Sequence, residues 1–150
     1  MTMHVLDATL YDNIQGALRT GLTLVPGVPD DAHLIDENRN FEPTEGDVWL
    51  GWTFFPQPNR PVSISHPQTV IRHFGAVIID YYVARNRGSK EADDFASAVV
   101  AMYLRRASPF IYNGQLVTIR NAFATRGMNI DQFYTRSITV GWQADTVTNT

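Results

Sequence analysis

The side chains that most often perform chemistry are few in this sequence and widely spaced. Cysteine is absent, which excludes a disulfide, a thiolate metal site and a cysteine nucleophile. The histidines match no metal-binding spacing; they are His4, His33, His66 and His73. A catalytic set of Ser65, His66 and Asp80, or a metal site of His66, His73 and Asp80, would need three coincidences of folding. We therefore expect His66 in a proline-rich loop and His73 as a hydrogen-bonded strand residue.

Sequence motifs for catalysis are also missing. The chain has no glycine-rich phosphate-binding pattern, metalloprotease histidine pair, calcium loop or nucleophile elbow. Positive charges do gather at the two ends of one predicted helix, at Arg85, Arg87, Lys90, Arg105 and Arg106. They could contact phosphate, but we favour ordinary complementation of the helix dipole and solvated turn charge. We predict no enzyme, no cofactor, no metal and no sequence-specific nucleic-acid binding.

The bulk composition is that of a soluble globular protein. The 150 residues fit one domain, residues 1–150, large enough to bury a core without disulfides. Only 18% of residues are charged, which leaves a more neutral surface compatible with subunit contacts. No stretch approaches the length of a membrane span, and no basic segment with a following apolar run opens the chain. We expect synthesis in the cytoplasm and no membrane partner.

The net charge of −3 hides a segregation of charge along the chain. Residues 1–59 carry nine acids and two bases, whereas residues 60–126 carry nine bases and four acids. Patches of opposite sign would favour head-to-tail contact between copies. The alternative is that the two halves mix in space, so that their charges cancel.

Hydrophobic periodicity predicts a strand and a helix at the centre of the chain. Residues 70–84 are rich in β-branched and aromatic side chains and alternate in polarity, which is typical of a half-buried strand. After a basic turn at residues 85–88, Ser89 is a plausible N-cap, and apolar residues then recur every three or four positions until Pro109 stops the helix. A helix with one apolar face needs a sheet to cover.

The N-terminal half predicts a second helix and an aromatic strand. A helix runs from about Asp7 to Gly21, and residues 48–55 form a strand that is apolar on both faces. Between them, residues 23–47 form a long irregular loop with a short edge strand around residues 33–36. The prolines of residues 56–67 predict no strand there, but a stiff projecting arm or an extended crossover; a disordered loop is the alternative.

The C-terminal third predicts a hairpin and a final strand. Asn113-Gly114 is a strong hairpin signal between Phe110–Tyr112 and a strand that starts at Gln115. Residues 126–131 read as a turn, residues 133–144 as the last strand, and residues 145–150 as a frayed polar tail. The fold class is therefore α+β, with a mainly antiparallel sheet of four to five strands and two helices packed on one face.

These elements in this order resemble a known family. The N-terminal amphipathic helix, the strand Asp47-Val48-Trp49-Leu50-Gly51-Trp52, the strand Phe74 to Tyr81, the helix Ala92 to Leu104, the hairpin at Gly114 and the strand Tyr134 to Trp142 are similar to those of tail-terminator proteins of long-tailed bacteriophages and prophages. The resemblance covers about residues 6–143 and includes no catalytic signature. The chain departs from the family pattern in its acidic loop at residues 23–47 and its proline-dense residues 56–67.

The resemblance implies a structural virion protein. Such a subunit would form a homohexameric ring, cap the tail tube, end its polymerisation and join the tail to a neck or head-completion protein. The ring would lie at the head-proximal end of the tail, with DNA passing through its lumen without specific binding. The residues expected at subunit or tube contacts are Trp49, Phe55, Arg60, Arg85 and Arg87, because they lie in or beside turns or on a doubly apolar strand.

Two other functions remain open. A head-tail connector or neck subunit makes similar demands on a small α+β protein. A small-ligand-binding or enzymatic α+β domain, with a pocket between the sheet and the loops, belongs to a different class. Oligomeric state and a ligand screen separate this last class from the assembly proteins.

Overall fold

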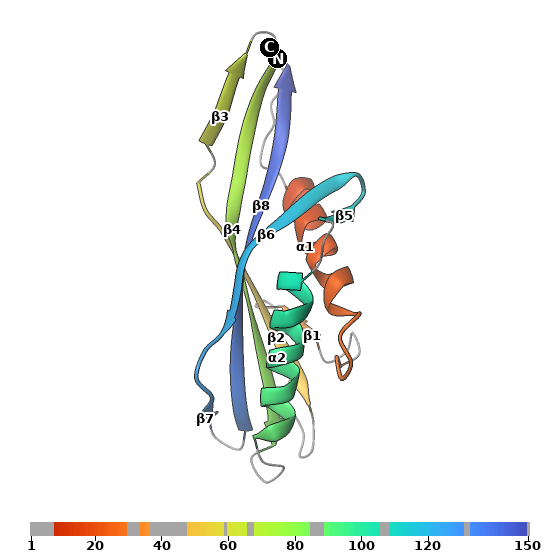
Figure 1. Ribbon diagram of the computed structural model, residues 1–150, viewed down its shortest axis with the longest axis vertical. Coiled ribbons are helices and arrows are strands. Elements are labelled where there is room, and N and C mark those ends of the chain that lie inside the picture. Colours follow the sequence, from red (N-terminus) through yellow and green to blue (C-terminus); the bar gives the residue numbers. More distant parts are fainter. Residues whose placement is uncertain are drawn as a thin grey trace.

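The computed structural model describes residues 8–29, 34–36, 48–58, 60–65, 68–84, 89–105, 109–130 and 133–149. These residues form two helices and eight strands (Figure 1). In chain order the elements are α1 (Ala8–Leu22), β1 (Leu34–Asp36), β2 (Trp49–Pro56), β3 (Arg60–Ser65), β4 (Gln68–Ala84), α2 (Lys90–Arg105), β5 (Phe110–Tyr112), β6 (Gln115–Ala124), β7 (Met128–Ile130) and β8 (Phe133–Asn149).

One strongly twisted sheet contains all of these strands. Its main path runs β1-β2-β4-β8-β6-β5, while β3 pairs with β4 and β7 pairs with β8. Each described pair is antiparallel except β1 with β2. The central pair is the longest, since β4 and β8 stay in register from Gln68 opposite Asn149 to Ala84 opposite Phe133. The predicted fold class is confirmed, and the six strands of the main path are close to the four to five expected.

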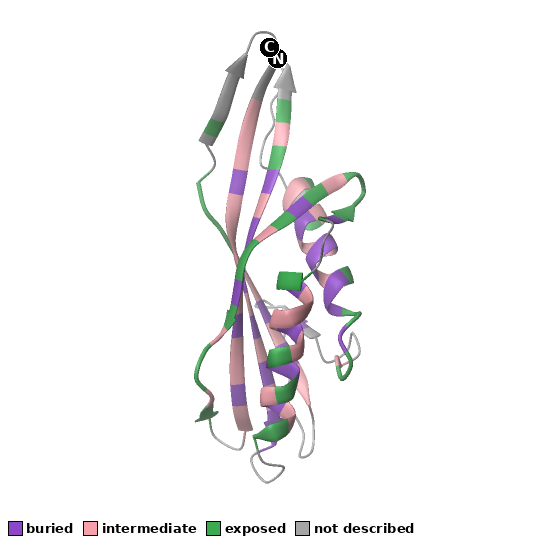
Figure 2. Ribbon diagram, viewed as in Figure 1, coloured by how far each residue is buried: buried purple, intermediate pink, exposed green. Residues whose placement is uncertain are grey.

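Both helices cover one face of the sheet, here called the inner face (Figures 1 and 2). Alternation along β4 buries every second side chain against the helices, as predicted. The same holds for β2 and β8, and the core formed with the helices includes Leu50, Trp52, Val77, Ile79, Tyr81, Val83, Ile138, Val140 and Trp142. The predicted apolar stripes of α1 and α2 supply its other side, with Ile14, Leu18, Phe95, Val99 and Tyr103 fully or almost fully buried.

Directed hydrogen bonds fix the helices on this core. The Tyr103 hydroxyl donates to the backbone oxygen of Leu18 at 2.7 Å and so joins α2 to α1. Burial raises the pKa of Tyr103, which keeps the donor protonated. At the other end of α2, the Asp93 carboxylate accepts from Arg136 of β8 at 2.8 Å. The backbone carbonyl of Ser89 accepts a hydrogen bond from the amide of Asp93 at 3.0 Å, as expected of a residue at the predicted N-cap position.

The predicted hairpin of β5 and β6 curls over α1. Its turn has positive φ at both central residues, 49° at Asn113 and 79° at Gly114, as a tight two-residue hairpin requires. Phe110 is buried against α1, where its ring occupies the space that a side chain at position 21 would need. Gly21 therefore permits close approach of the hairpin to the helix.

The proline-rich segment corrects one expectation. Residues 60–65 form strand β3, although the prolines predicted that no strand would be sustained there. Among the described strands β3 pairs with β4 alone, and its register shifts between Pro61 and Ser63. An edge strand tolerates proline because one side of its backbone needs no partner. Together with the start of β4 and the end of β8, β3 forms an arm that extends beyond the helices (Figure 1), in agreement with the expected projecting arm.

Two further expectations at the C-terminus were wrong. Residues 145–149 continue β8 instead of fraying, because β4 begins early enough to pair with them. A bidentate ion pair across these strands, Arg72 to Asp145 at 3.0 and 3.1 Å, adds to this pairing. Residues 126–131 were expected to form a turn, but Met128–Ile130 form β7 against the start of β8. A three-residue strand is too short to show periodicity in a sequence.

We predict that Gly21→Ala destabilises the protein. Helix propensity alone would favour alanine by about 1 kcal/mol, but the new methyl group meets the buried Phe110 ring, and overpacking of this kind costs about 1–3 kcal/mol. Urea unfolding followed by circular dichroism measures the difference. The same substitution made in a Phe110→Leu background should cost less, because leucine lacks the outer ring atoms. An equal loss in both backgrounds would show that this contact is not the cause.

Candidate functional site

The candidate catalytic and metal sets are not assembled by this fold. His73 and Asp80 both belong to β4, but they differ in parity and so lie on opposite faces of the sheet. His73 is buried on the inner face and its Nε2 lies 2.8 Å from the Thr146 hydroxyl, which confirms the expected hydrogen-bonded strand residue. His66 lies outside the described residues. Among the residues described, no three metal-ligating side chains gather closely enough to hold an ion.

The face of the sheet without helices, here called the outer face, is the most distinctive surface. Directly opposed residues form rows across β2, β4, β8 and the strands beside them. The rows are Phe55–Ala76–Gly141–Asn121, Thr53–Ile78–Thr139–Phe123, Gly51–Asp80–Ser137 and Trp49–Tyr82–Thr135–Met128. In these rows β8 contributes small side chains only, whereas larger apolar side chains come from β2, β4, β6 and β7.

Exposed apolar side chains concentrate on this outer face. Of the ten large hydrophobic residues that are exposed in the described part of the chain, five belong to it: Phe55, Phe123, Met128, Ile130 and Val147. Ile111 and Leu116, 58% and 52% exposed, form a cross-strand pair on the side of the hairpin that faces away from α1. Several exposed apolar side chains on one face of a sheet are typical of a surface that contacts another protein.

An aromatic cluster closes one end of the outer face. The rings of Trp49 and Tyr82 stack with centroids 3.8 Å apart, and Phe133 meets both edge-on at 6.0 and 6.4 Å. Burial, together with the nearby carboxylate of Asp80, raises the pKa of Tyr82. The Asp80 carboxylate itself accepts a hydrogen bond from Ser137.

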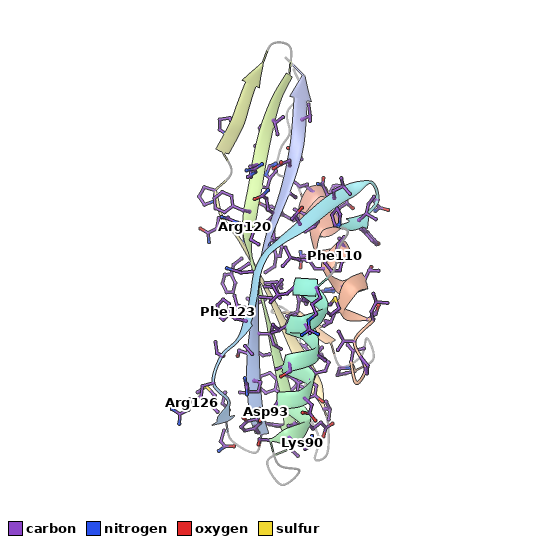
Figure 3. All side chains as sticks on the ribbon, in the orientation of Figure 1. Lys90, Asp93, Phe110, Arg120, Phe123 and Arg126 are labelled. Carbon is purple, nitrogen blue, oxygen red and sulfur yellow. The ribbon has the colours of Figure 1, made fainter. Side chains whose placement is uncertain are left out.

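A shallow groove of about 430 Å³ crosses the middle of the outer face. Its floor is flat because it contains Gly75, Ala76 and Gly141, and its walls include Phe74 and Phe123. The other residues at the groove are polar: Gln57, Arg120, Asn121 and Thr139. The Arg120 guanidinium lies 5.6 Å from the centre of the Phe74 ring. Figure 3 shows Arg120 and Phe123 on the side of the sheet away from the helices.

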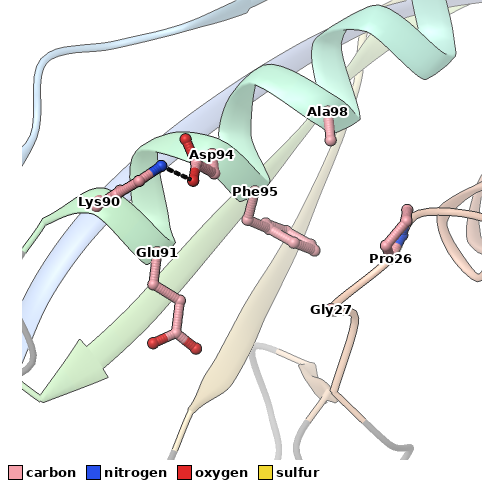
Figure 4. Close-up of a pocket in the computed structure, with 7 residues that line it drawn as sticks. All are labelled: Pro26, Gly27, Lys90, Glu91, Asp94, Phe95 and Ala98. Carbon is pink, nitrogen blue, oxygen red and sulfur yellow. Dashed lines mark hydrogen bonds and ion pairs between the residues drawn. The ribbon is translucent and has the colours of Figure 1, made fainter.

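A second pocket lies between α2 and the turn after α1 (Figure 4). It measures about 680 Å³, and Phe95 and Pro26 provide its apolar lining. Lys90 pairs there with Asp94 at 2.7 Å, one helical turn away, and this hydrogen bond raises the pKa of Lys90. Both partners are exposed, so the pair is an ordinary helix-surface interaction rather than a charge held ready for a ligand.

Comparison with known proteins decides the family. The family model for phage tail terminator protein matches residues 12–142, which include most of α1, all of α2 and β1 to β7, and the first ten residues of β8. The chain belongs to the phage tail terminator family. Members of this family are structural components of phage tails, so the protein is a viral structural protein of the bacteriophage tail. A search of curated proteins found no match.

A solved structure has a similar fold. It covers 87% of this chain and 94% of its own length, with a TM-score of 0.56 and 19% sequence identity. At this identity the likeness extends to the fold alone. Within the described part of the terminator chain, neither helix has the length and apolarity needed to cross a membrane.

The five residues expected at terminator contacts fall in different places. Trp49 and Phe55 lie on the outer face of β2, but at its two ends, about 20 Å apart at 3.3 Å per residue. Trp49 is half-buried in the aromatic cluster, whereas the Phe55 side chain is 44% exposed. Arg60 pairs with Arg72 in the arm. Arg85 and Arg87 lie outside the described residues, so only Trp49 and Phe55 can be assigned to a face.

Other residues of the outer face were not selected from the sequence. Tyr82 and Phe133 complete the aromatic cluster, and Arg120 and Phe123 line the groove. The sequence did give a signal for Tyr82 and Phe133: alternation along β4 and β8 places both on the face opposite the buried side chains. No comparable signal existed in β6, because the register shift between Ile119 and Asn121 interrupts its alternation.

We predict that Asp80→Asn lowers the pKa of Tyr82. The substitution removes the negative charge that opposes ionisation of the phenol, while Tyr11, whose pKa is raised by burial alone, should not change. Alkaline titration of tyrosine Cζ resonances by NMR measures both. Because the folded pKa of Tyr82 is raised, its contribution to the free energy of unfolding is lost as the pH rises above about 10. An unchanged Tyr82 midpoint would contradict this electrostatic account.

Proposed function

We propose that copies of this protein form a homohexameric ring that caps the tail tube, ends its polymerisation and joins the tail to the head. The partners are the chain itself, the tail tube protein and a neck or head-completion protein. The ring lies at the head-proximal end of the tail, and DNA passes through its lumen without specific binding. The subunit, residues 1–150, acts as one domain and is made in the host cytoplasm.

The observation that carries this proposal is the outer face. Helices and sheet bury one another on the inner face, but the outer face keeps Phe55, Phe123 and Met128 exposed with no described element above them. Exposed apolar groups on such a face favour association, because burying them removes apolar area from water. A structural tail protein with such a face is suited to contact other subunits.

The geometry of the sheet favours contacts that close into a ring. β1 and the β5–β6 hairpin stand at opposite ends of the strand order, so the two sides of a subunit differ. Contact between two different surfaces is heterologous, and it closes into a ring when the rotation between copies divides a full turn. The projecting arm adds reach, because it extends past the helices toward a neighbouring subunit or layer.

Mass measured by light scattering during size-exclusion chromatography tests the proposal. We expect six copies, or a monomer that becomes hexameric only when purified tail tubes are added. The measurement is made at low and high salt, because exposed charges are screened as salt rises. Binding to portal complexes instead of tubes would identify a neck subunit. A salt-insensitive monomer that ignores tubes and binds a small ligand saturably would overturn both assembly functions.

We predict that Phe55→Ser and Phe123→Ser weaken assembly while the monomer stays folded. Both side chains are nearly half exposed, so polar replacements remove little from the core. Leu104→Ser is the matched control, since Leu104 is 53% exposed but lies at the end of α2 on the helix side. Circular dichroism checks folding and light scattering checks mass. Equal effects of all three substitutions would show that the outer face is not the contact.

Substitution of Trp49 should affect the stability of the monomer, unlike substitution of Phe55. Its ring stacks on Tyr82 within the same subunit, so Trp49→Ala removes an internal contact as well as any contact with a neighbour. We therefore expect Trp49→Ala to lower the free energy of unfolding of the monomer in addition to weakening assembly. Urea unfolding at concentrations below assembly separates the two effects. A variant with parental stability would show that the stack contributes nothing to the fold.

A further inference from the structure

The groove on the outer face combines a cation, hydrogen-bond donors and aromatic walls. Arg120 is exposed, and among the described residues no carboxylate lies within ion-pair distance of its guanidinium. The neighbouring Asn121 uses its side-chain oxygen to accept the amide of Gly141 at 3.1 Å, which leaves its NH₂ group as the donor. Phe74 lies beneath the guanidinium, and Phe123 stands at the other side of the floor.

This combination is suited to a carboxylate next to an aromatic side chain. A guanidinium binds carboxylates through paired hydrogen bonds, and the donors of Arg120 and Asn121 belong to adjacent residues. The phenyl rings provide apolar surface that a nucleic-acid backbone would not fill. Among the described residues that line the groove, Arg120 is the one cation, whereas nucleic-acid binding depends on several phosphate contacts.

The same sequence contains a segment of matching chemistry. Residues 36–47 carry five acids and one arginine, and Phe41 stands directly before Glu42. This segment begins at the last residue of β1, which forms one end of the strand order, whereas Arg120 belongs to β6 near the other end. The segment begins at one edge of the sheet, whereas Arg120 stands toward the other edge, and this arrangement suits contact between successive copies.

We propose that the groove beside Arg120 receives the acid-rich segment of residues 36–47 from the next copy of the chain. This inference rests on the proposed ring and specifies one of its subunit contacts. Glu42 or a neighbouring acid pairs with Arg120, while Phe41 packs against Phe74 or Phe123. The segregation of acids and bases along the sequence then becomes a device that orients the subunits head to tail.

A synthetic peptide of residues 36–47 tests the groove in the full-length protein. Fluorescence anisotropy of the labelled peptide is measured at low salt, with protein dilute enough to be monomeric. We expect saturable binding that Arg120→Glu weakens at least about tenfold, since like charges then face each other. Arg126→Glu is the matched control, because Arg126 is exposed and changes the net charge equally but lies outside the groove. A peptide with its acids replaced by amides should not bind.

The outcomes separate this contact from the proposed function. If the parent protein forms hexamers but the peptide does not bind, or binds Arg120→Glu equally well, the groove contact is overturned while the ring stands. If the peptide binds as expected but neither the protein alone nor the protein with tubes forms hexamers, the ring fails while the groove retains its ligand. Displacement of the peptide by short duplex DNA would show that the groove binds phosphate, and would overturn the proposal that its ligand is a carboxylate.

Charge reversal on both sides provides a second measurement. Arg120→Glu should reduce assembly in light scattering, and combining it with Glu37→Lys, Glu42→Lys or Glu45→Lys should restore assembly for at least one pair. Circular dichroism confirms that each variant folds. If Arg120→Glu assembles like the parent protein, Arg120 is not at a subunit contact and the proposal is overturned.

Discussion

The pairing of β4 with β8 is the constraint on which the rest of this structure depends. Seventeen residues of each strand remain in register without a bulge, so the parity of every side chain is set along the full length of the sheet. A shift by one residue would carry Trp142 and Val140 to the outer face and bring Thr139 into the core. Helix cover, the position of β2 and the rows of the outer face all follow from that register.

Most of the fold could be predicted because its long elements have clear periods. The stripes of both helices, the alternation of β4 and β8 and the Asn113-Gly114 turn each reflect local physics that a sequence displays. The expectations that were wrong depend on partners distant in the sequence. Residues 145–149 are strand because β4 starts at Gln68, and β3 accommodates proline because it occupies an edge. Neither fact can be read from the segment itself.

The candidate site was less accessible to sequence reasoning than the fold. Trp49 and Phe55 were selected for their aromatic character, and the outer face includes both. Arg120 was not selected, because a bulge in β6 interrupts the alternation that would assign its side chain to a face. The groove also depends on Ala76 and Gly141, small residues that give no functional signal in a sequence. Surfaces made from several strands are defined by their register, which only the assembled sheet provides.

The arm distributes stability unevenly over the molecule. Its three strands extend past both helices, so they share hydrogen bonds and the Arg72–Asp145 pair but little of the helix-covered core (Figure 1). Regions with many backbone hydrogen bonds and few buried apolar contacts open locally at a lower free energy than the core. Amide protons at the start of β4 should therefore exchange with solvent faster than those near Ile79, so that one continuous strand contains two dynamic regimes. A neighbouring subunit that holds the arm would remove this difference, and ordering the arm would then become part of the free energy of assembly.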